Sequence, residues 1–428
     1  ITAFLVRSFD GAALQFSVPV VVQRDLLSET ALDPAGADGA AAILIERVKG
    51  QAEDMPALGP LYGKGIPGSQ RYRDTIEPYT VIHSEEALAS HLWKADTGNF
   101  CDRSGVHLLL RGAIPCPGGE RKVADALGGL ADAIGMIVEK TPLAPIEASW
   151  LASLDQKLLR KGLHKQGLVS FVADGSKLAR TLTHHRCFYR VAGPKTGVSV
   201  PFCCPVELGP VEPELPASGG TVTGLGIRQR EVLAIAGSNA QGKSTFLEGI
   251  LAGMDDHAPH DGRELVVTAR GACTAESTTM GLAGADISMF FSALPPGVSG
   301  TVRSVHGMGS GSMTMAWQVQ SAIARHAPLL IIDEDHAAPN LLVKSCLQKE
   351  EITPLAEILA HEREKMGETA LVFAACAMDT LIAQADRIMV LDRHEVSAID
   401  TGEFRKMLAG SLRRTADGLE IFQDEKKS

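Results

Sequence analysis

The fold is decided by the stretch Gly237-Ser238-Asn239-Ala240-Gln241-Gly242-Lys243-Ser244-Thr245. This stretch matches the pattern G-x-x-x-x-G-K-[S/T], follows an apolar run at 232–236 and precedes a helical stretch at 244–251. A strand, a glycine-rich loop and a helix in this order are the context in which the pattern binds phosphate groups. The alternative, a glycine-rich turn that arose by chance, does not explain the two flanking elements.

The residue types in the loop predict how it holds a nucleotide. Backbone N–H groups and the positive end of the following helix would surround the β-phosphate. The Lys243 ammonium would neutralise β- and γ-phosphate oxygens, and the Ser244 hydroxyl would bind Mg²⁺. The expected cofactors are therefore ATP or ADP, together with Mg²⁺.

Two carboxylates, Asp333 and Glu334, directly follow the apolar run at 329–332. A charge at the end of a buried strand is costly unless it is paired, so these side chains need a cation or a polarised water. The alternative is an acidic cluster that faces solvent. We favour the first interpretation, which predicts a site for a metal ion and a water molecule.

A further anion site is predicted at Ser310, Gly311 and Ser312, which open a helical stretch at 313–320. The free N–H groups at a helix N-terminus attract anions. Ser310 lies 23 residues before Asp333. Without that spacing, a flexible linker would explain the Ser-Gly-Ser run about as well.

These motifs together resemble those of ABC ATPases. The resemblance implies that Asp333 holds Mg²⁺ through water, that Glu334 polarises the attacking water, and that Ser310 is the signature serine. It also implies a head-to-tail homodimer in which each ATP lies between Lys243 of one subunit and Ser310 of the other, with Gly311 and Ser312 beside the nucleotide. Lys243, Ser310 and Glu334 are thus the expected catalytic residues.

The sequence departs from the usual ABC pattern at several places. Cys376 stands where most members have the switch histidine, and Asn340 stands where the family usually has Asp. No glutamine lies between Ser244 and Trp317 to fill a Q-loop. Because a thiol cannot donate a charged hydrogen bond to the γ-phosphate, we expect slow or regulated turnover.

The region from about 165 to 400 is similar to one subgroup, the predicted ABC-class ATPases that lack transporter partners. That subgroup occurs in bacteria, archaea and kinetoplastids, where a member is associated with mitochondrial RNA editing. It usually has His at the position of Gln241 and Thr-Ser at His336-Ala337. The kinetoplastid member is the favoured match, which implies RNA as a partner, a role in RNA editing and a location in the mitochondrial matrix.

Length and composition predict two domains and no membrane segment. The chain has 428 residues, and five prolines between residues 201 and 220 mark a linker. We therefore expect an α/β domain at 1–212 and an ABC-type P-loop NTPase domain with a mostly parallel sheet at 213–428.

No apolar run reaches the roughly 18 to 20 residues that cross a bilayer. Eight cysteines without a Cys-x-x-Cys pair predict reduced, intracellular thiols. Because the chain begins with Ile1, any targeting signal would lie outside it.

The charge balance gives no general preference for nucleic acid, because 51 acidic residues oppose 41 basic ones. A local RNA surface is predicted at Lys64, Arg71, Tyr72 and Arg73, which combine cations with an aromatic ring in a glycine-rich loop. The alternative is a solvated loop. A second basic cluster comprises Lys157, Arg160, Lys161 and Lys165, and it fits the charged face of a helix end better than an RNA surface.

Two functions other than an RNA-coupled ATPase remain open: a small-molecule kinase, and a nucleotide-gated scaffold with incidental turnover.

Overall fold

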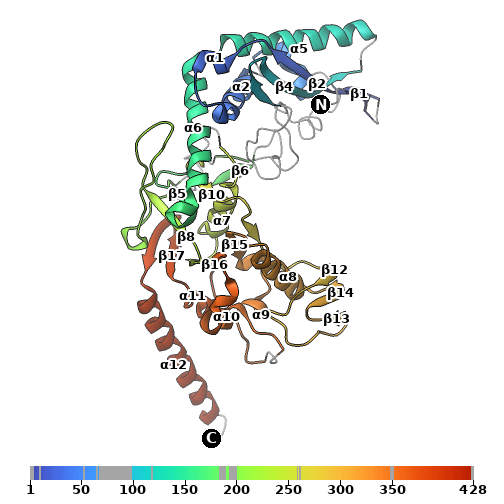
Figure 1. The fold of residues 1–428 in the computed structure, drawn as a ribbon. Coiled ribbons are helices and arrows are strands. Elements are labelled where there is room, and N and C mark those ends of the chain that lie inside the picture. The colour runs from blue at the N-terminus through green and yellow to red at the C-terminus, as the bar shows by residue number, and fades with distance from the viewer. Residues whose placement is uncertain are drawn as a thin grey trace.

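The computed structural model of the chain describes residues 4–8, 11–51, 54–63, 66, 99–116, 119–182, 189–191, 200–257, 259, 262–347 and 351–425. Within these residues an N-terminal unit is connected by a long helix to a larger unit, from which a C-terminal helix projects (Figure 1). The predicted α/β fold with a mostly parallel sheet is confirmed. Lys64 and Arg71–Arg73, the predicted RNA surface, lie outside the described residues.

The larger unit is built on a six-stranded sheet in the order β11-β15-β16-β9-β17-β18. The first five of these strands are parallel, and β18 pairs with β17 in the antiparallel sense. The strands span Cys273–Thr274 (β11), Leu329–Asp333 (β15), Ala370–Ala375 (β16), Val232–Ala236 (β9), Arg387–Asp392 (β17) and Glu395–Ile399 (β18). The apolar runs at 232–236 and 329–332 form β9 and most of β15, as expected.

Helices cover both faces of this sheet, which is why β15, β16 and β9 are almost entirely apolar. Leu233 and Ile235 of β9 pack with α7 (Lys243–Ala252), while Ala234 between them packs with α8 (Gly311–Ala324). Alternate residues of a strand point to opposite faces, so the two helices lie on opposite sides. The helices α9 (Pro339–Leu342), α10 (Leu355–His361) and α11 (Asp379–Ile382) share the α8 side.

Two smaller sheets flank this layer. One has the order β10-β5-β8, with strands Val266–Thr268 (β10), Leu168–Ala173 (β5) and Gly224–Arg228 (β8). The other has the order β12-β14-β13, with strands Met280–Ala285 (β12), Ser304–Gly309 (β14) and Ser299–Thr301 (β13). Because β14 leads directly into α8, the second sheet positions Ser310, which lies between them.

The N-terminal unit is a four-stranded antiparallel sheet with helices packed against it. Its order is β1-β2-β4-β3, with strands Phe4–Arg7 (β1), Ala13–Val22 (β2), Gly105–Pro115 (β4) and Phe100–Asp102 (β3). Its core includes residues from α1 (Leu26–Thr30), α2 (Ala37–Gln51) and α5 (Glu120–Lys140). The long connecting helix α6 (Leu143–Gly162) adds Trp150, whose side chain is fully buried.

The structure suggests a different division from the one expected at residue 212. That division separates β5 from β8, yet the two strands pair from Leu168–Arg228 to Ala173–Gly224. The buried residues of the N-terminal core end at Trp150, and those of the next cluster along the chain begin at Leu159. We therefore propose that the two units meet within α6, and that the proline-rich stretch is a loop of the larger unit.

Candidate functional site

The predicted phosphate-binding loop joins β9 to α7 in the geometry that the motif requires. Gly237 has φ +139°, and a Cβ atom there would lie 2.3 Å from the carbonyl oxygen of Leu391 on β17. Gly242 precedes α7 with φ +100°. Only glycine adopts the first conformation without strain, so these two residues explain how the chain turns tightly from strand to helix.

Lys243 is the first residue of α7, and its side chain folds back over the loop. Its Nζ donates hydrogen bonds to the carbonyl oxygens of Gly237, at 2.9 Å, and Ser238, at 2.8 Å. The residue is only 9% exposed. These two bonds hold a buried ammonium beside the first N–H groups of α7, which have no partner within the helix.

A β-hairpin turn that the sequence analysis missed supports the same loop. The backbone N–H of Arg393 donates to the side-chain oxygen of Gln241, and Nδ1 of His394 lies 3.2 Å from the Gln241 carbonyl oxygen. Arg393 and His394 have φ values of 49° and 68°, as the central residues of a tight turn between β17 and β18 do. The side chain of Gln241 therefore ties the loop to the neighbouring strand.

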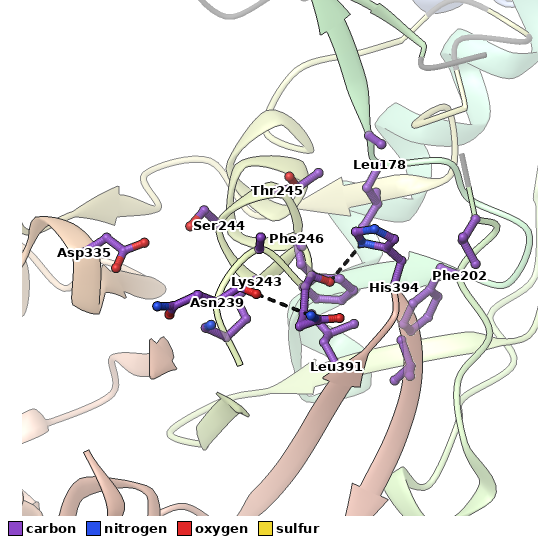
Figure 2. A pocket seen from close by; sticks show the side chains of 16 residues that line it. Leu178, Phe202, Asn239, Lys243, Ser244, Thr245, Phe246, Asp335, Leu391 and His394 are labelled. Carbon is purple, nitrogen blue, oxygen red and sulfur yellow. Dashed lines mark hydrogen bonds between the residues drawn. The ribbon is translucent and has the colours of Figure 1, made fainter. Parts of the chain in front are cut away.

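A pocket of about 420 Å³ opens in front of this loop (Figure 2). Its polar part contains loop residues 239–245 and Asp335. Its apolar part is lined by Leu178, Val200, Phe202, Leu391 and Val396, with His394 between the two parts. A cavity with phosphate-binding groups on one side and apolar side chains on the other matches a nucleotide, which has a charged tail and a flat base. The sequence analysis did not identify Phe202, which lies in the proline-rich stretch.

The two predicted carboxylates lie at the edge of the sheet where the phosphate-binding loop also begins. Asp333 pairs with Ala374, and Ala375 pairs with Ala236, so β15, β16 and β9 end together. Oε2 of Glu334 accepts hydrogen bonds from the backbone N–H groups of Cys376 and Ala377, the second at 3.3 Å. Backbone N–H groups at and after Cys376, which stands where most ABC ATPases have the switch histidine, thus fix the carboxylate of Glu334.

The oxygen donors present fit the chemistry of Mg²⁺. Ser244 and Asp335 line the same pocket, and Asp333, half-buried at the end of β15, accepts a hydrogen bond from the Asp335 N–H at 3.2 Å. Mg²⁺ prefers hydroxyl, carboxylate and phosphate oxygens and keeps several waters. In the described part of the chain no three His, Cys, Asp or Glu side chains gather to hold a metal by themselves.

The strand beside β15 adds an acidic residue that the sequence analysis did not consider. β11 pairs with β15 in the parallel sense, so Glu276 and Ser277 follow β11 at the edge where Asp333 lies. The Ser277 N–H donates to the His336 carbonyl oxygen at 2.7 Å, which ties the two strand ends together. Glu276 is exposed.

The predicted signature residues lie apart from this pocket. Ser310 is exposed and precedes the first turn of α8, and Ser310, Gly311 and Ser312 are not among the residues that line the pocket. The Ser312 hydroxyl donates to the side-chain oxygen of Asn340 at 2.7 Å. Within one chain the loop and the carboxylates therefore lie near one another, and the N-terminus of α8 lies outside the pocket.

Two of the four cations of the second basic cluster are engaged in contacts within the chain. Arg160 forms an ion pair with Asp256 at 2.7 Å, and Lys157 contacts Asp38 and Asp256. Lys161 and Lys165 are exposed. The cluster therefore does not present four cations together to phosphate groups.

Comparisons with known proteins show which family the chain is similar to. The model of the ABC ATPase P-loop domain family matches residues 143–420. An uncharacterized protein of Methanocaldococcus jannaschii is 38% identical over 375 residues, which cover 87% of this chain and 82% of that protein. No helix in the described ranges is both long enough and apolar enough to cross a membrane.

Solved ABC transporter subunits are also similar to part of the chain. CbiO1 from Clostridium perfringens, part of the transporter complex cbiONQ, is 15% identical, with 49% of this chain and 96% of that chain covered and a TM-score of 0.31. A nucleotide-free ATP-binding cassette from an ABC transporter is 14% identical, with coverages of 44% and 87% and a TM-score of 0.28. The kinetoplastid assignment stays a prediction.

Proposed function

Because the chain belongs to the ABC ATPase P-loop family, we propose that it binds ATP with Mg²⁺ in the pocket at the phosphate-binding loop and hydrolyses it. The observation that carries this proposal is the pocket itself. Its polar part contains Lys243 and the N-terminus of α7, and its apolar part contains Phe202 and Val396. One occupant with a polyphosphate and a flat base satisfies both parts.

Each residue group then has a distinct task. The loop N–H groups and Lys243 bind and orient the phosphates, and Ser244 with Asp333 would hold Mg²⁺, which neutralises phosphate charge when it is bound. Glu334 accepts the proton of the attacking water. Its carboxylate is fixed by two backbone N–H groups, which restrict its orientation. Because hydrolysis needs little covalent chemistry from the protein, positioning and charge account for most of the catalysis.

The separation of Ser310 from the pocket supports a site shared between two subunits. The α8 N-terminus of one copy would contact the γ-phosphate bound by the other. Ser310→Arg should abolish turnover and leave ATP binding intact. Mixing Ser310→Arg with Lys243→Ala subunits should restore part of the activity, because one complete site forms in each mixed dimer. Mixtures that stay inactive although the subunits exchange would contradict the shared site.

The hydrolysis itself is tested by phosphate release together with an independent measurement of nucleotide binding. Lys243→Ala should lose both, because the buried ammonium and its two contacts to the loop are removed. Lys344→Ala is the matched control, since Lys344 forms an exposed ion pair with Glu357 away from the pocket. Equal nucleotide affinity in Lys243→Ala and in Lys344→Ala would refute the proposed site.

We propose that the ATPase cycle acts on RNA, which the N-terminal unit binds or remodels. This proposal is supported by the sequence of residues 61–73 and by the resemblance to the kinetoplastid protein, which also suggests RNA editing in the mitochondrion. Phosphate contacts release counterions, so changing Lys64, Arg71 and Arg73 to Ala should weaken homopolymer RNA binding and lower its salt dependence. An unchanged dissociation constant across a salt series would reject this surface.

A nucleotide-gated scaffold is the second candidate, and Cys376 favours it. The thiol of Cys376 supplies no imidazole that could donate a charged hydrogen bond to the γ-phosphate. Slow turnover with partner binding that depends on nucleotide would support the scaffold. Transfer of labelled phosphate to a small-molecule acceptor, rather than to water, would instead support a kinase.

A further inference from the structure

The connecting helix α6 contacts both the N-terminal unit and the helix that carries the phosphate-binding lysine. It runs from the N-terminal unit to the neighbourhood of α7 and β10 (Figure 1). Its twenty residues make it about 30 Å long. Several polar side chains along it are buried, although a solvated linker helix would need none of them buried.

The C-terminal part of α6 forms hydrogen bonds to the end of α7 and to the residues that follow it. Nη2 of Arg160 donates to the carbonyl oxygens of Gly253, at 3.1 Å, and Asp255, at 3.0 Å, while Nη1 donates to the Asp256 carboxylate at 2.7 Å. Gln156 donates to the His257 carbonyl oxygen at 2.8 Å and accepts from the His257 N–H at 2.6 Å. The Gly253 carbonyl belongs to the C-cap of α7, and the other acceptors lie in the segment that directly follows it. These bonds therefore tie α6 to the C-terminal end of α7.

The near end of α6 is built into the N-terminal core. The Ser149 hydroxyl donates to the Gly39 carbonyl oxygen of α2 at 2.7 Å, and the Trp150 indole N–H donates to the Asp33 carbonyl oxygen at 2.7 Å. A Cβ atom on Gly39 would lie 2.0 Å from the Ser149 carbonyl oxygen. The backbones of α2 and α6 therefore touch at Gly39 and Ser149.

The side chain of Lys157 contacts both the N-terminal unit and the segment that follows α7. Its ammonium contacts the Asp38 carboxylate on α2, donates to the Ala35 carbonyl oxygen at 2.6 Å and lies 3.6 Å from the Asp256 carboxylate after α7. Asp256 is also bound by Arg160, and both of these side chains are less than a tenth exposed. The chain Asp38, Lys157, Asp256 and Arg160 thus runs from one unit to the other.

We propose that α6 is a rigid strut that positions α7 and links nucleotide binding to the state of the N-terminal unit, with Lys157 as the positioning residue that closes the link. The inference rests on the proposed nucleotide site. Since α7 has ten residues, phosphate contacts at Lys243 and the α6 contacts at Gly253 to His257 lie at opposite ends of one short, stiff element. A ligand that changes the orientation of α7 must then also act on α6 and α2. By linkage, a ligand on the N-terminal unit changes nucleotide affinity by the same factor.

The test is hydrogen exchange of the full chain with and without ADP and Mg²⁺. In the parent, nucleotide should slow amide exchange in residues 243–252 and also in residues 37–51 of α2. In Lys157→Met, the response of 243–252 should remain and the response of 37–51 should fall by about fivefold or more. A merely structural role of Lys157 would raise exchange of 37–51 in both states and leave the nucleotide-dependent difference unchanged.

Lys344→Met is the control for removing a lysine from an ion pair, and it should behave as the parent does. If Lys157→Met does not fold, Asp38→Asn tests the same contact from its more exposed side. Protection of 243–252 alone in the parent would overturn the strut and leave the nucleotide site standing. Protection of neither segment would refute the nucleotide site, and the strut with it.

Discussion

Replacing Glu334 by Gln tests the proposed chemistry with the smallest change in shape. Oε2 of Glu334 accepts the N–H groups of both Cys376 and Ala377, so the amide oxygen of glutamine can keep both bonds. The phosphate-binding loop does not contact this side chain through any described hydrogen bond. Binding of ATP with Mg²⁺ should therefore stay close to that of the parent, while the group that accepts the proton is lost.

The expected loss in hydrolysis follows from the value of a positioned general base. Such a base contributes about 10² to 10⁴ in rate, which corresponds to about 3 to 5 kcal/mol of barrier. Phosphate release at saturating ATP measures the loss, and a separate binding measurement shows that the site is intact. Glu362→Gln, which changes an exposed partner of Lys365, is the control. A rate for Glu334→Gln within about twofold of the parent would remove Glu334 from the proposed role.

Two further predictions concern stability. Gly237→Ala should destabilise the fold by about 2 to 4 kcal/mol, because its Cβ would meet the Leu391 carbonyl oxygen. In urea unfolding, Gly219→Ala should cost less, since φ is also positive there but no atom lies within 4 Å; equal losses would contradict the clash. Burial raises the pKa of Asp386, but hydrogen bonds from the Arg363 guanidinium and from a backbone N–H outweigh burial and hold that pKa below its usual range. The ionised Asp386 therefore stabilises the fold fully at any pH above its ordinary pKa. This stabilisation is lost as the pH falls through the lowered pKa. Arg363→Met should move the acid-unfolding midpoint, followed by circular dichroism, to higher pH, and an unchanged midpoint would count against this ion pair.

The parts of the site that the sequence predicted are those made by contiguous residues. The run at 232–236 forms β9 with the expected bounds, because five consecutive apolar residues before a glycine-rich loop have few other structures open to them. The loop and its helix follow for the same reason. The spacing of Ser310 from Asp333 was informative only through the resemblance, since no local rule connects the two residues.

The parts that were missed depend on contacts between residues far apart in the chain. Gln241 is tied to a turn 152 residues later, and Glu334 is held by the backbone 42 residues later. Lys157 was interpreted as part of a charged helix face, because its partner Asp38 lies 119 residues earlier. Charge and spacing along one helix cannot reveal such a partner, so the cluster resembled a surface although it forms a junction.

The departures from the usual ABC pattern can be understood from which atoms make each contact. At Cys376 the contact to Glu334 is made by the backbone N–H, which any residue except proline supplies. At Asn340 the side-chain oxygen accepts the Ser312 hydroxyl, an acceptor role that Asp would also fill. Cys376 and Asn340 therefore retain these contacts within the folded chain.

The one function that the backbone of Cys376 cannot replace is that of a charged hydrogen-bond donor to the γ-phosphate. Placing that donor at 376 with Cys376→His should then raise the hydrolysis rate without changing the free energy of unfolding. Equal rates in Cys376→His and the parent would show that turnover is limited by another step.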